Sequence, residues 1–285
     1  MIKATMVLEG GAKRGVFTAG ALDFLMDNDL YVSHVVGVSA GSCNAIDYVS
    51  RQPGRSKDCM IQREKEYSYI ADFRTIVKER TLIDMEKLFH RFPMEDFPFD
   101  FETYFSSDAV CECVVTNCMT GKAEYLTEDK DKEKLMKICR ASSSMPLVSP
   151  IVKIDGIPYL DGGLADSIPV KRAVEIGNKK IILILTRQKG YRKKPVSKAE
   201  ANIYRRAYRR YPELVKSILR RPIVYNRTAQ WIEKLEEEGK IFVLRPSMPT
   251  IGRMEKDYEK LLTFYEHGYD SMKEQADRLT KFLEI

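Results

Sequence analysis

The sequence predicts an α/β protein with a mainly parallel, helix-covered sheet. Apolar runs at 4–8 and 31–36 are each followed by a turn of small residues and a helix pattern, so residues 1–50 are typical of a β-α-β-α unit. A third apolar run, 179–186, follows a helix pattern that stops at Gly177 and indicates another buried strand. This alternation of strands and helices favours parallel pairing.

The other elements follow from periodicity and turn residues. Residues 51–110 indicate helices at 63–69 and 81–92, followed by a dense run of aromatic residues at 97–105. These aromatics either line or cover a pocket, or they pack a loop against the core. Further along, the sequence predicts strands at 110–118, 123–126 and 241–244, and helices at 131–141, 170–176 and about 256–283.

A serine stands in the turn between the second strand and its helix. Gly37 and Gly41 flank Ser39 in the pattern Gly-x-Ser-x-Gly, and residues 43–48 continue as a helix. Such a turn lifts a nucleophilic hydroxyl clear of the sheet, and the glycines allow neighbouring backbones to approach closely. We therefore expect Ser39 to be a nucleophile at a helix N-terminus.

A glycine-rich turn also follows the first strand. The helix after it is expected to bury one stripe, formed by Val16, Phe17, Ala19, Leu22 and Leu25. Backbone N–H groups in such a turn stabilise an anion, which is either a bound phosphate, as in a dinucleotide-binding turn, or the oxyanion of acyl transfer. The presence of Ser39 in the next turn favours an oxyanion hole. Its residues are Gly10, Gly11, Ala12, Lys13, Arg14 and Gly15.

A third motif carries a carboxylate. Asp161 ends a short apolar approach, and Gly162 and Gly163 allow the chain to turn sharply behind it. A carboxylate in this position can accept the proton of a serine if the fold brings the two together. The alternative is an Asp-Gly turn that closes a hairpin.

These three motifs, in this order, resemble those of the patatin-like phospholipases. The resemblance extends over residues 140–146 and covers most of residues 4–186, and the basic part after 190 is similar to the C-terminal region of a bacterial subgroup. It implies a three-layer α/β/α fold for a single catalytic domain, residues 1–285. A basic helical excursion at about 190–240 and a closing helix at about 256–283 would belong to that domain.

The resemblance also implies a Ser39–Asp161 dyad that acts without histidine or cofactor on acyl esters, typically of lipids. Ala12 departs from the family pattern, which usually has a third glycine there. If that position needs a positive φ, alanine costs roughly 1 kcal/mol and misaims the N–H donor. A catalytically weak binding or regulatory protein is therefore one alternative, and an acyltransferase or thioesterase at the same site is another.

A Ser–Asp–His triad is a further possibility. In chain order it would use Ser39, Asp161 and His267. However, a conventional hydrolase fold needs several strands before its nucleophile, and only one strand–helix unit precedes Ser39 here. The dyad is the preferred interpretation.

Composition indicates a globular protein of the cytoplasm. Apolar residues make up 44% of the chain and charged residues 31%, and no window holds the roughly 20 apolar residues of a membrane-spanning helix. The first strand starts within four residues of the N-terminus, which leaves no room for a signal peptide. The six cysteines lack Cys-x-x-Cys spacing, so we expect reduced thiols and no metal.

Positive charge is concentrated in residues 187–222, which carry +11 in a chain of net +6. Tyrosines and aliphatic residues recur at helical spacing beneath these charges, with a break expected at Pro212. Such a helix suits peripheral contact with an anionic membrane. The alternative is a helix pair packed on the core with a solvated basic face. No nucleic-acid-binding module accompanies the charge, so we expect no nucleic-acid partner.

Overall fold

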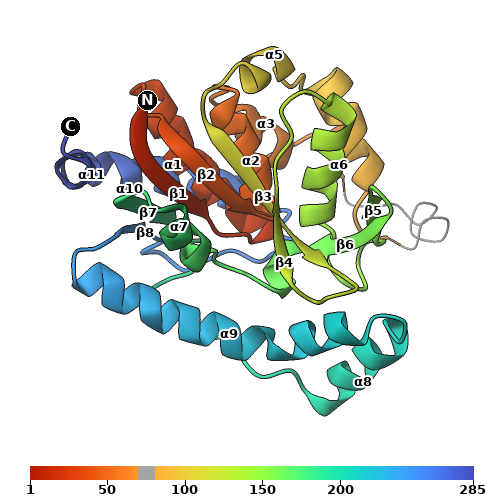
Figure 1. The fold of residues 1–285 in the computed structure, drawn as a ribbon. Helices are drawn as coiled ribbons and strands as arrows, with labels where there is room; N and C mark the ends of the chain where they lie inside the picture. Colours follow the sequence, from red (N-terminus) through yellow and green to blue (C-terminus); the bar gives the residue numbers. More distant parts are fainter. Residues whose placement is uncertain (70–80) are drawn as a thin grey trace.

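Residues 1–69 and 81–285 are described in a computed structural model of the chain (Figure 1). Their centre is an eight-stranded sheet of order β5-β6-β3-β2-β1-β7-β8, in which β4 also pairs with β3. The strands are β1 (Ile2–Leu8), β2 (Val32–Val38), β3 (Val110–Asn117), β4 (Ala123–Leu126), β5 (Val152–Ile154), β6 (Ile157–Asp161), β7 (Lys180–Ile184) and β8 (Phe242–Leu244).

Five neighbouring strands pair in parallel, in the order β3, β2, β1, β7 and β8. The pairs β3–β4, β3–β6 and β5–β6 are antiparallel. The prediction of a mainly parallel sheet is therefore confirmed.

Helices cover both faces of this sheet and form three layers. On one face, α1 (Gly15–Asp27), α2 (Ala40–Val49) and α6 (Lys132–Ser142) pack on Met6 and Leu8 of β1 and their neighbours. On the other face, α7 (Val170–Ile176) and α9 (Pro212–Glu237) pack on Val7 and the alternate residues of β7 and β8. Alternate side chains of one strand thus enter opposite cores, as the period of a strand requires.

Helix α1 is buried from Gly15 to Met26, and not only along the expected stripe. The reason is a second helix, α10 (Tyr258–Glu274), which packs on its outer side. A Cβ on Gly20 would lie 2.1 Å from the Tyr265 carbonyl oxygen, and one on Gly268 would lie 2.0 Å from that of Phe17. The two helices therefore cross through reciprocal glycine contacts. The single helix predicted at 256–283 is two helices, α10 and α11 (Ala276–Leu283).

The segment after α2 departs most from the sequence prediction. It contains α3 (Arg55–Met60), a 3-10 turn (Lys65–Tyr67) where a helix was predicted, and a π-helix (Lys87–Asp96). Pro93 lies inside the π-helix. Because proline lacks an N–H, it cannot donate the usual α-helical hydrogen bond, and this explains why the helix widens there. The aromatic residues that follow, including α5 (Phe101–Phe105), pack on one another and on the core.

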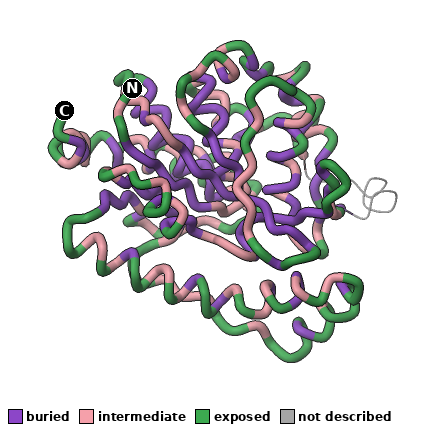
Figure 2. The backbone as a smooth tube through the Cα atoms, in the orientation of Figure 1, coloured by how far each residue is buried: buried purple, intermediate pink, exposed green. Residues whose placement is uncertain are grey.

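The basic segment forms α8 (Lys198–Ala207) and the first part of α9, which begins at the predicted break, Pro212. Its apolar side, including Tyr208, Leu214 and Ile218, packs on Leu160 at the end of β6 and on Leu164 just after it. Arg205 and Arg206 of α8 are exposed, and the tube of this helix is mostly green in Figure 2. The packed apolar side matches the helix-pair interpretation, and contact of the basic face with an anionic membrane stays a prediction. No helix in the described ranges has the length and apolar character needed to cross a membrane.

The helix crossing makes a prediction for stability. We expect Gly268→Ala to lower the free energy of unfolding by about 1–3 kcal/mol, because the new methyl group meets backbone that cannot yield easily. Urea denaturation followed by circular dichroism measures the change. Gly252→Ala is the matched control, because a Cβ there would meet only the Glu255 nitrogen, at an ordinary van der Waals distance of 3.9 Å. Equal stability of the two variants would contradict the close crossing.

Candidate active site

Ser39 occupies the turn between β2 and α2 in a strained conformation. Its φ is 57° and its ψ is −126°, a region that costs a non-glycine residue about 1–3 kcal/mol. It stands at the N-cap of α2, where the helix dipole favours negative charge on bound groups. The sequence therefore placed this serine correctly between strand and helix.

The turn is held by close contact with the glycine loop. A Cβ on Gly10 would lie 2.6 Å from the Val38 carbonyl oxygen and 2.8 Å from the Ser39 Cβ. A Cβ on Gly41 would lie 2.3 Å from the Leu8 carbonyl oxygen. Glycine is needed at these positions because two chain reversals pass within van der Waals distance of each other.

Ser142, at the end of α6, supports the same turn from a distant part of the sequence. Its hydroxyl accepts a hydrogen bond from the Ser39 N–H (2.9 Å), donates to the Val114 carbonyl (2.6 Å) and lies 2.8 Å from the Ser42 hydroxyl. The Ser42 hydroxyl donates in turn to the Gly37 carbonyl (2.8 Å). Residues 140–146 resembled the family in sequence, but only the structure shows that Ser142 positions the turn.

The glycine loop leaves its first three N–H groups free. Those of Gly10, Gly11 and Ala12 donate no hydrogen bond to any described residue, and all three residues line a cavity together with Ser39. The other three N–H groups of the loop do donate. The Lys13 N–H donates to the Arg253 carbonyl, the Arg14 N–H to the Gly11 carbonyl, and the Gly15 N–H to the Ala12 and Lys13 carbonyls. The available donors are therefore the first three residues of the six predicted.

Ala12 has a φ of 50°. This is the left-handed region, in which alanine is disfavoured by roughly 1–2 kcal/mol relative to glycine. The position does require a positive φ, so the departure from the family pattern carries the predicted strain.

The sheet register brings Asp161 to Ser39. Along β3, Val114 pairs with Val38 of β2 and Val115 pairs with Asp161 of β6, while β4 occupies the other edge of both. The ends of β2 and β6 therefore meet on one edge of β3, one residue apart. Asp161 and Ser39 line the same cavity as a result.

Backbone contacts hold Asp161 on both sides. Its N–H donates to the Ser144 carbonyl (2.8 Å) and its Oδ1 accepts from the Gly163 N–H (2.7 Å). A Cβ on Gly162 would lie 2.1 Å from the Val114 carbonyl oxygen, which explains the glycine behind the aspartate.

Burial raises the pKa of the Asp161 carboxyl above its ordinary value, because only 5% of the residue is exposed. The Arg221 charge, hydrogen bonding from the Ser39 side chain and the Gly163 N–H act against this rise. A raised pKa makes this carboxylate a stronger base toward a serine hydroxyl than a free aspartate.

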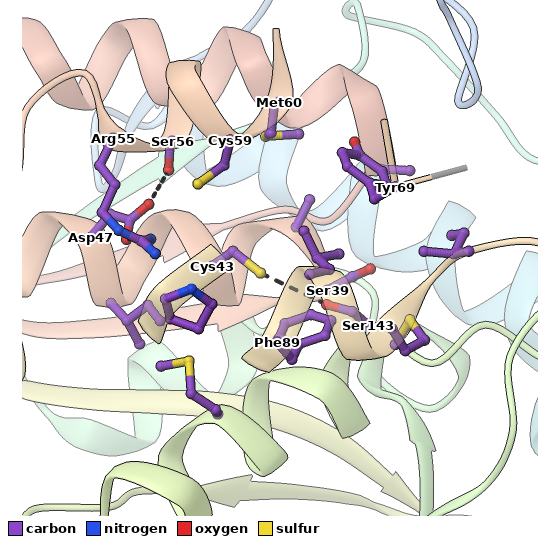
Figure 3. Close-up of a pocket in the computed structure, with 18 of the residues that line it drawn as sticks. Ser39, Cys43, Asp47, Arg55, Ser56, Cys59, Met60, Tyr69, Phe89 and Ser143 are labelled. Atoms are coloured by element: carbon purple, nitrogen blue, oxygen red, sulfur yellow. Dashed lines mark hydrogen bonds and ion pairs between the residues drawn. The ribbon is translucent and has the colours of Figure 1, made fainter. Parts of the chain in front are cut away.

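An apolar cavity extends from Ser39 between α2, α3 and the π-helix (Figure 3). Its wall contains Cys43, Ile46, Met60, Tyr69, Ile83, Met85, Leu88, Phe89, Pro93 and Met145. In Figure 3 the buried ion pair of Asp47 and Arg55, whose nearest atoms are 2.6 Å apart, lies across the cavity from Ser39. The aromatic residues at 97–105 do not line this cavity. The aromatic rings in its wall are those of Tyr69 and Phe89.

A second, polar cavity opens on the other side of Ser39. Besides the free N–H groups and Asp161, it is lined by Arg14, Lys193 and Arg253. The last two come from the segment after 187, and no motif in the sequence pointed to them.

The histidines lie elsewhere. None of the three lines either cavity beside Ser39, and Nε2 of His267 accepts a hydrogen bond from the Ser247 N–H (3.1 Å). The triad alternative thus has no histidine in position. All six cysteines are free thiols, and the described residues contain no cluster of three or more potential metal ligands.

Two family models match separate parts of this chain. The family model described as patatin-like phospholipase matches residues 6–174, and a domain of unknown function, DUF6363, matches residues 211–284. The uncharacterized protein YjjU of Escherichia coli K12 is 30% identical over 194 residues, which are 65% of this chain and 52% of that protein.

A probable lipid hydrolase, 463L, of Invertebrate iridescent virus 6 is 25% identical over 193 residues, 62% of this chain and 65% of that protein. The chain thus spans between half and two thirds of the length of these relatives. The crystal structure of VipD from Legionella pneumophila aligns over 98% of this chain and 67% of VipD, with 14% identity and a TM-score of 0.48.

We predict that Ser142→Ala lowers turnover about 100-fold, because the Ser39 N–H loses its acceptor and the nucleophile moves. Initial rates on a chromogenic ester measure the loss, and circular dichroism checks the fold. Ser149→Ala is the control, since the buried Ser149 hydroxyl has no hydrogen-bond partner among the described residues. Full activity of Ser142→Ala would contradict the positioning role.

If Asp161 acts as the base, its pKa determines how kcat/KM falls on the acid side of the pH profile. The carboxylate must be ionised to accept a proton, so kcat/KM should fall as pH drops through its pKa. Because burial raises that pKa, the fall should lie above the ordinary aspartate value of about 3.9. A pH profile of kcat/KM between pH 4 and 9 tests this, and a flat profile in a stable enzyme would exclude Asp161 as the base.

Proposed function

Because the chain belongs to the patatin-like phospholipase family, we propose that it hydrolyses lipid acyl esters with Ser39 as nucleophile and Asp161 as base. The name of the viral relative, a probable lipid hydrolase, supports lipid hydrolysis in general. The observation that carries the proposal is the position of Ser39, which lines both the apolar cavity and the polar cavity that holds Asp161. An acyl chain on one side and a polar group on the other fit these surroundings.

The reaction runs in two halves. Ser39 Oγ attacks the ester carbonyl while Asp161 takes its proton, and the N–H groups of Gly10, Gly11 and Ala12 hold the oxyanion. As the tetrahedral intermediate collapses, the alcohol leaves with the proton from Asp161 and the acyl group stays on Ser39.

Water then attacks the acyl-enzyme, with Asp161 accepting its proton. Collapse of the second intermediate returns the proton to Ser39 Oγ and releases the fatty acid. A thiol ester or an acceptor alcohol would pass through the same steps, so thioesterase and acyltransferase activity are variants of this chemistry.

A catalytically weak binding or regulatory protein is the second candidate. The observation that favours it is the left-handed backbone of Ala12, because this residue supplies one of the three free donors. Loss of one oxyanion donor costs about 10²–10³ in turnover. Such a protein would retain the anion site and the apolar cavity.

Covalent labelling tests the proposal. A fluorophosphonate should add once to the wild-type protein, not at all to Ser39→Ala and much more slowly to Asp161→Asn, as measured by intact mass. Asp166→Asn is the control, because the half-buried Asp166 carboxylate accepts from the Tyr125 hydroxyl (2.9 Å) and lines neither cavity.

Absence of an adduct on folded wild-type protein would shift the assignment to the binding role. Ala12→Gly would then show whether relief of the strained donor restores labelling.

A further inference from the structure

The apolar cavity beside Ser39 ends at charged side chains. Most of its wall is aliphatic, aromatic or sulfur-containing, but Asp47, Arg55 and Ser56 line it as well. In Figure 3 these three residues form a group at the end of the cavity away from Ser39. We propose that this group is the end wall of the acyl pocket and limits the preferred acyl chain to about eight to ten carbons. This inference rests on the proposed function.

Helix α2 gives the length of the pocket. Ser39 is its N-cap, and Cys43, Ile46 and Asp47 line the cavity from its following turns. Eight positions separate Ser39 from Asp47, and at a rise of about 1.5 Å per residue they span about 12 Å. An extended hydrocarbon chain with bonds of about 1.5 Å advances about 1.3 Å per carbon. About nine carbons therefore reach from the nucleophile to the end wall.

Hydrogen bonds from three parts of the chain hold the end wall in place. Arg55 Nη1 donates to Asp47 Oδ1 (2.6 Å), and the Ser56 hydroxyl donates to Asp47 Oδ2 (2.6 Å). Arg55 Nε and Nη2 both donate to the Phe97 carbonyl (3.1 and 2.9 Å). Asp47 is only 3% exposed. The group satisfies its own polar atoms and closes the pocket at a fixed point.

The aromatic segment 97–105 supports this wall from outside the cavity. The Arg55 guanidinium lies 5.1 Å from the centre of the Phe99 ring, which is itself buried in the core. The Gln52 side-chain amide donates to the Pro98 carbonyl (3.0 Å) and so holds the same segment to the turn before α3. The aromatic run therefore does not line the pocket, but it fixes the arginine that closes it.

The end wall limits chain length for an energetic reason. Each methylene group buried along the apolar wall strengthens binding about fourfold. A methylene group pushed into the ion pair would instead separate its partners, and a buried charge without its partner is strongly unfavourable. Because the ester carbonyl must stay at Ser39, a chain longer than the pocket cannot avoid this conflict by sliding outward. Reactivity should therefore rise with chain length up to the wall and then fall.

Competing substrates test the limit. Equimolar p-nitrophenyl esters, from hexanoyl to tetradecanoyl, are presented together in mixed detergent micelles, and the released fatty acids are measured by mass spectrometry. We expect the wild type to prefer the octanoyl and decanoyl esters and to hydrolyse the tetradecanoyl ester about tenfold or more slowly, because its chain exceeds the pocket. A rate that continues to rise up to the tetradecanoyl ester would overturn the end wall.

Removal of the wall should lengthen the preferred chain. Asp47→Ala combined with Arg55→Ala removes both charges together, so neither is left buried without its partner. The ratio of dodecanoyl to octanoyl hydrolysis should rise about tenfold or more, because at least two further methylene groups can be buried. The matched control combines Glu236→Ala with Arg245→Ala. This pair has the same 2.6 Å contact and the same 12% exposed arginine side chain, but it lines neither cavity, so the profile should not change.

A second variant leaves the ion pair intact. Ile46 lines the cavity before the wall, so Ile46→Phe should fill part of the pocket and shift the preference toward the hexanoyl ester. Circular dichroism checks that each variant is folded. A folded double variant, or a folded Ile46→Phe protein, with the wild-type profile would contradict the assignment.

A binding experiment separates this inference from the proposed function. Ser39→Ala protein forms no acyl-enzyme, and calorimetry with free fatty acids below their critical micelle concentrations should show affinity rising from hexanoate to decanoate and falling at tetradecanoate. If the wild type hydrolyses no ester but this limit is seen, the hydrolase proposal fails and the end wall stands. If esters are hydrolysed without a chain-length limit, the hydrolase proposal stands and the end wall is wrong.

Discussion

The site depends on one close approach, between the glycine loop after β1 and the Ser39 turn after β2. Parallel pairing of these strands carries both turns to the same end of the sheet, where Gly10 lies against Val38 and Gly41 lies against Leu8. A side chain at either glycine would force the turns apart. This contact holds Ser39 in its strained conformation and places the free N–H groups of the glycine loop in the wall of the cavity that Ser39 also lines.

A second constraint places Asp161, the proposed base. On one edge of β3, β2 pairs as far as Val114 and β6 pairs from Val115 onward. Because β6 runs antiparallel to β3, its last residue, Asp161, lies next to Val38 at the end of β2. An antiparallel strand within a parallel sheet is thus what allows a residue 122 positions after Ser39 to share its cavity. Ser142 links the two halves, because its hydroxyl contacts both the Ser39 N–H and the Val114 carbonyl.

The sequence predicted the features that local patterns encode. Ser39, Asp161 and the glycine loop lie in the turns that their neighbours indicated, and most strands lie where apolar runs stand. It could not predict burial of α1 on all sides, because this depends on reciprocal contact with Gly268, some 250 residues away. Ser142 and Lys193 were missed for the same reason. A lone serine or lysine carries no signal until distant backbone surrounds it.

The C-terminal segment contributes to the sheet and to the wall of the polar cavity. Residues 211–284 match a separate family model, yet they supply β8 to the central sheet and α10 to the outer face of α1. They also supply Arg253, whose carbonyl accepts from the N–H of Lys13 in the glycine loop. The glycine loop, Ser39 and Asp161 form part of the wall of the polar cavity, and the later segment adds positive charge to that wall through Arg253. Residues outside the motifs by which the family is recognised therefore line the polar cavity beside Ser39.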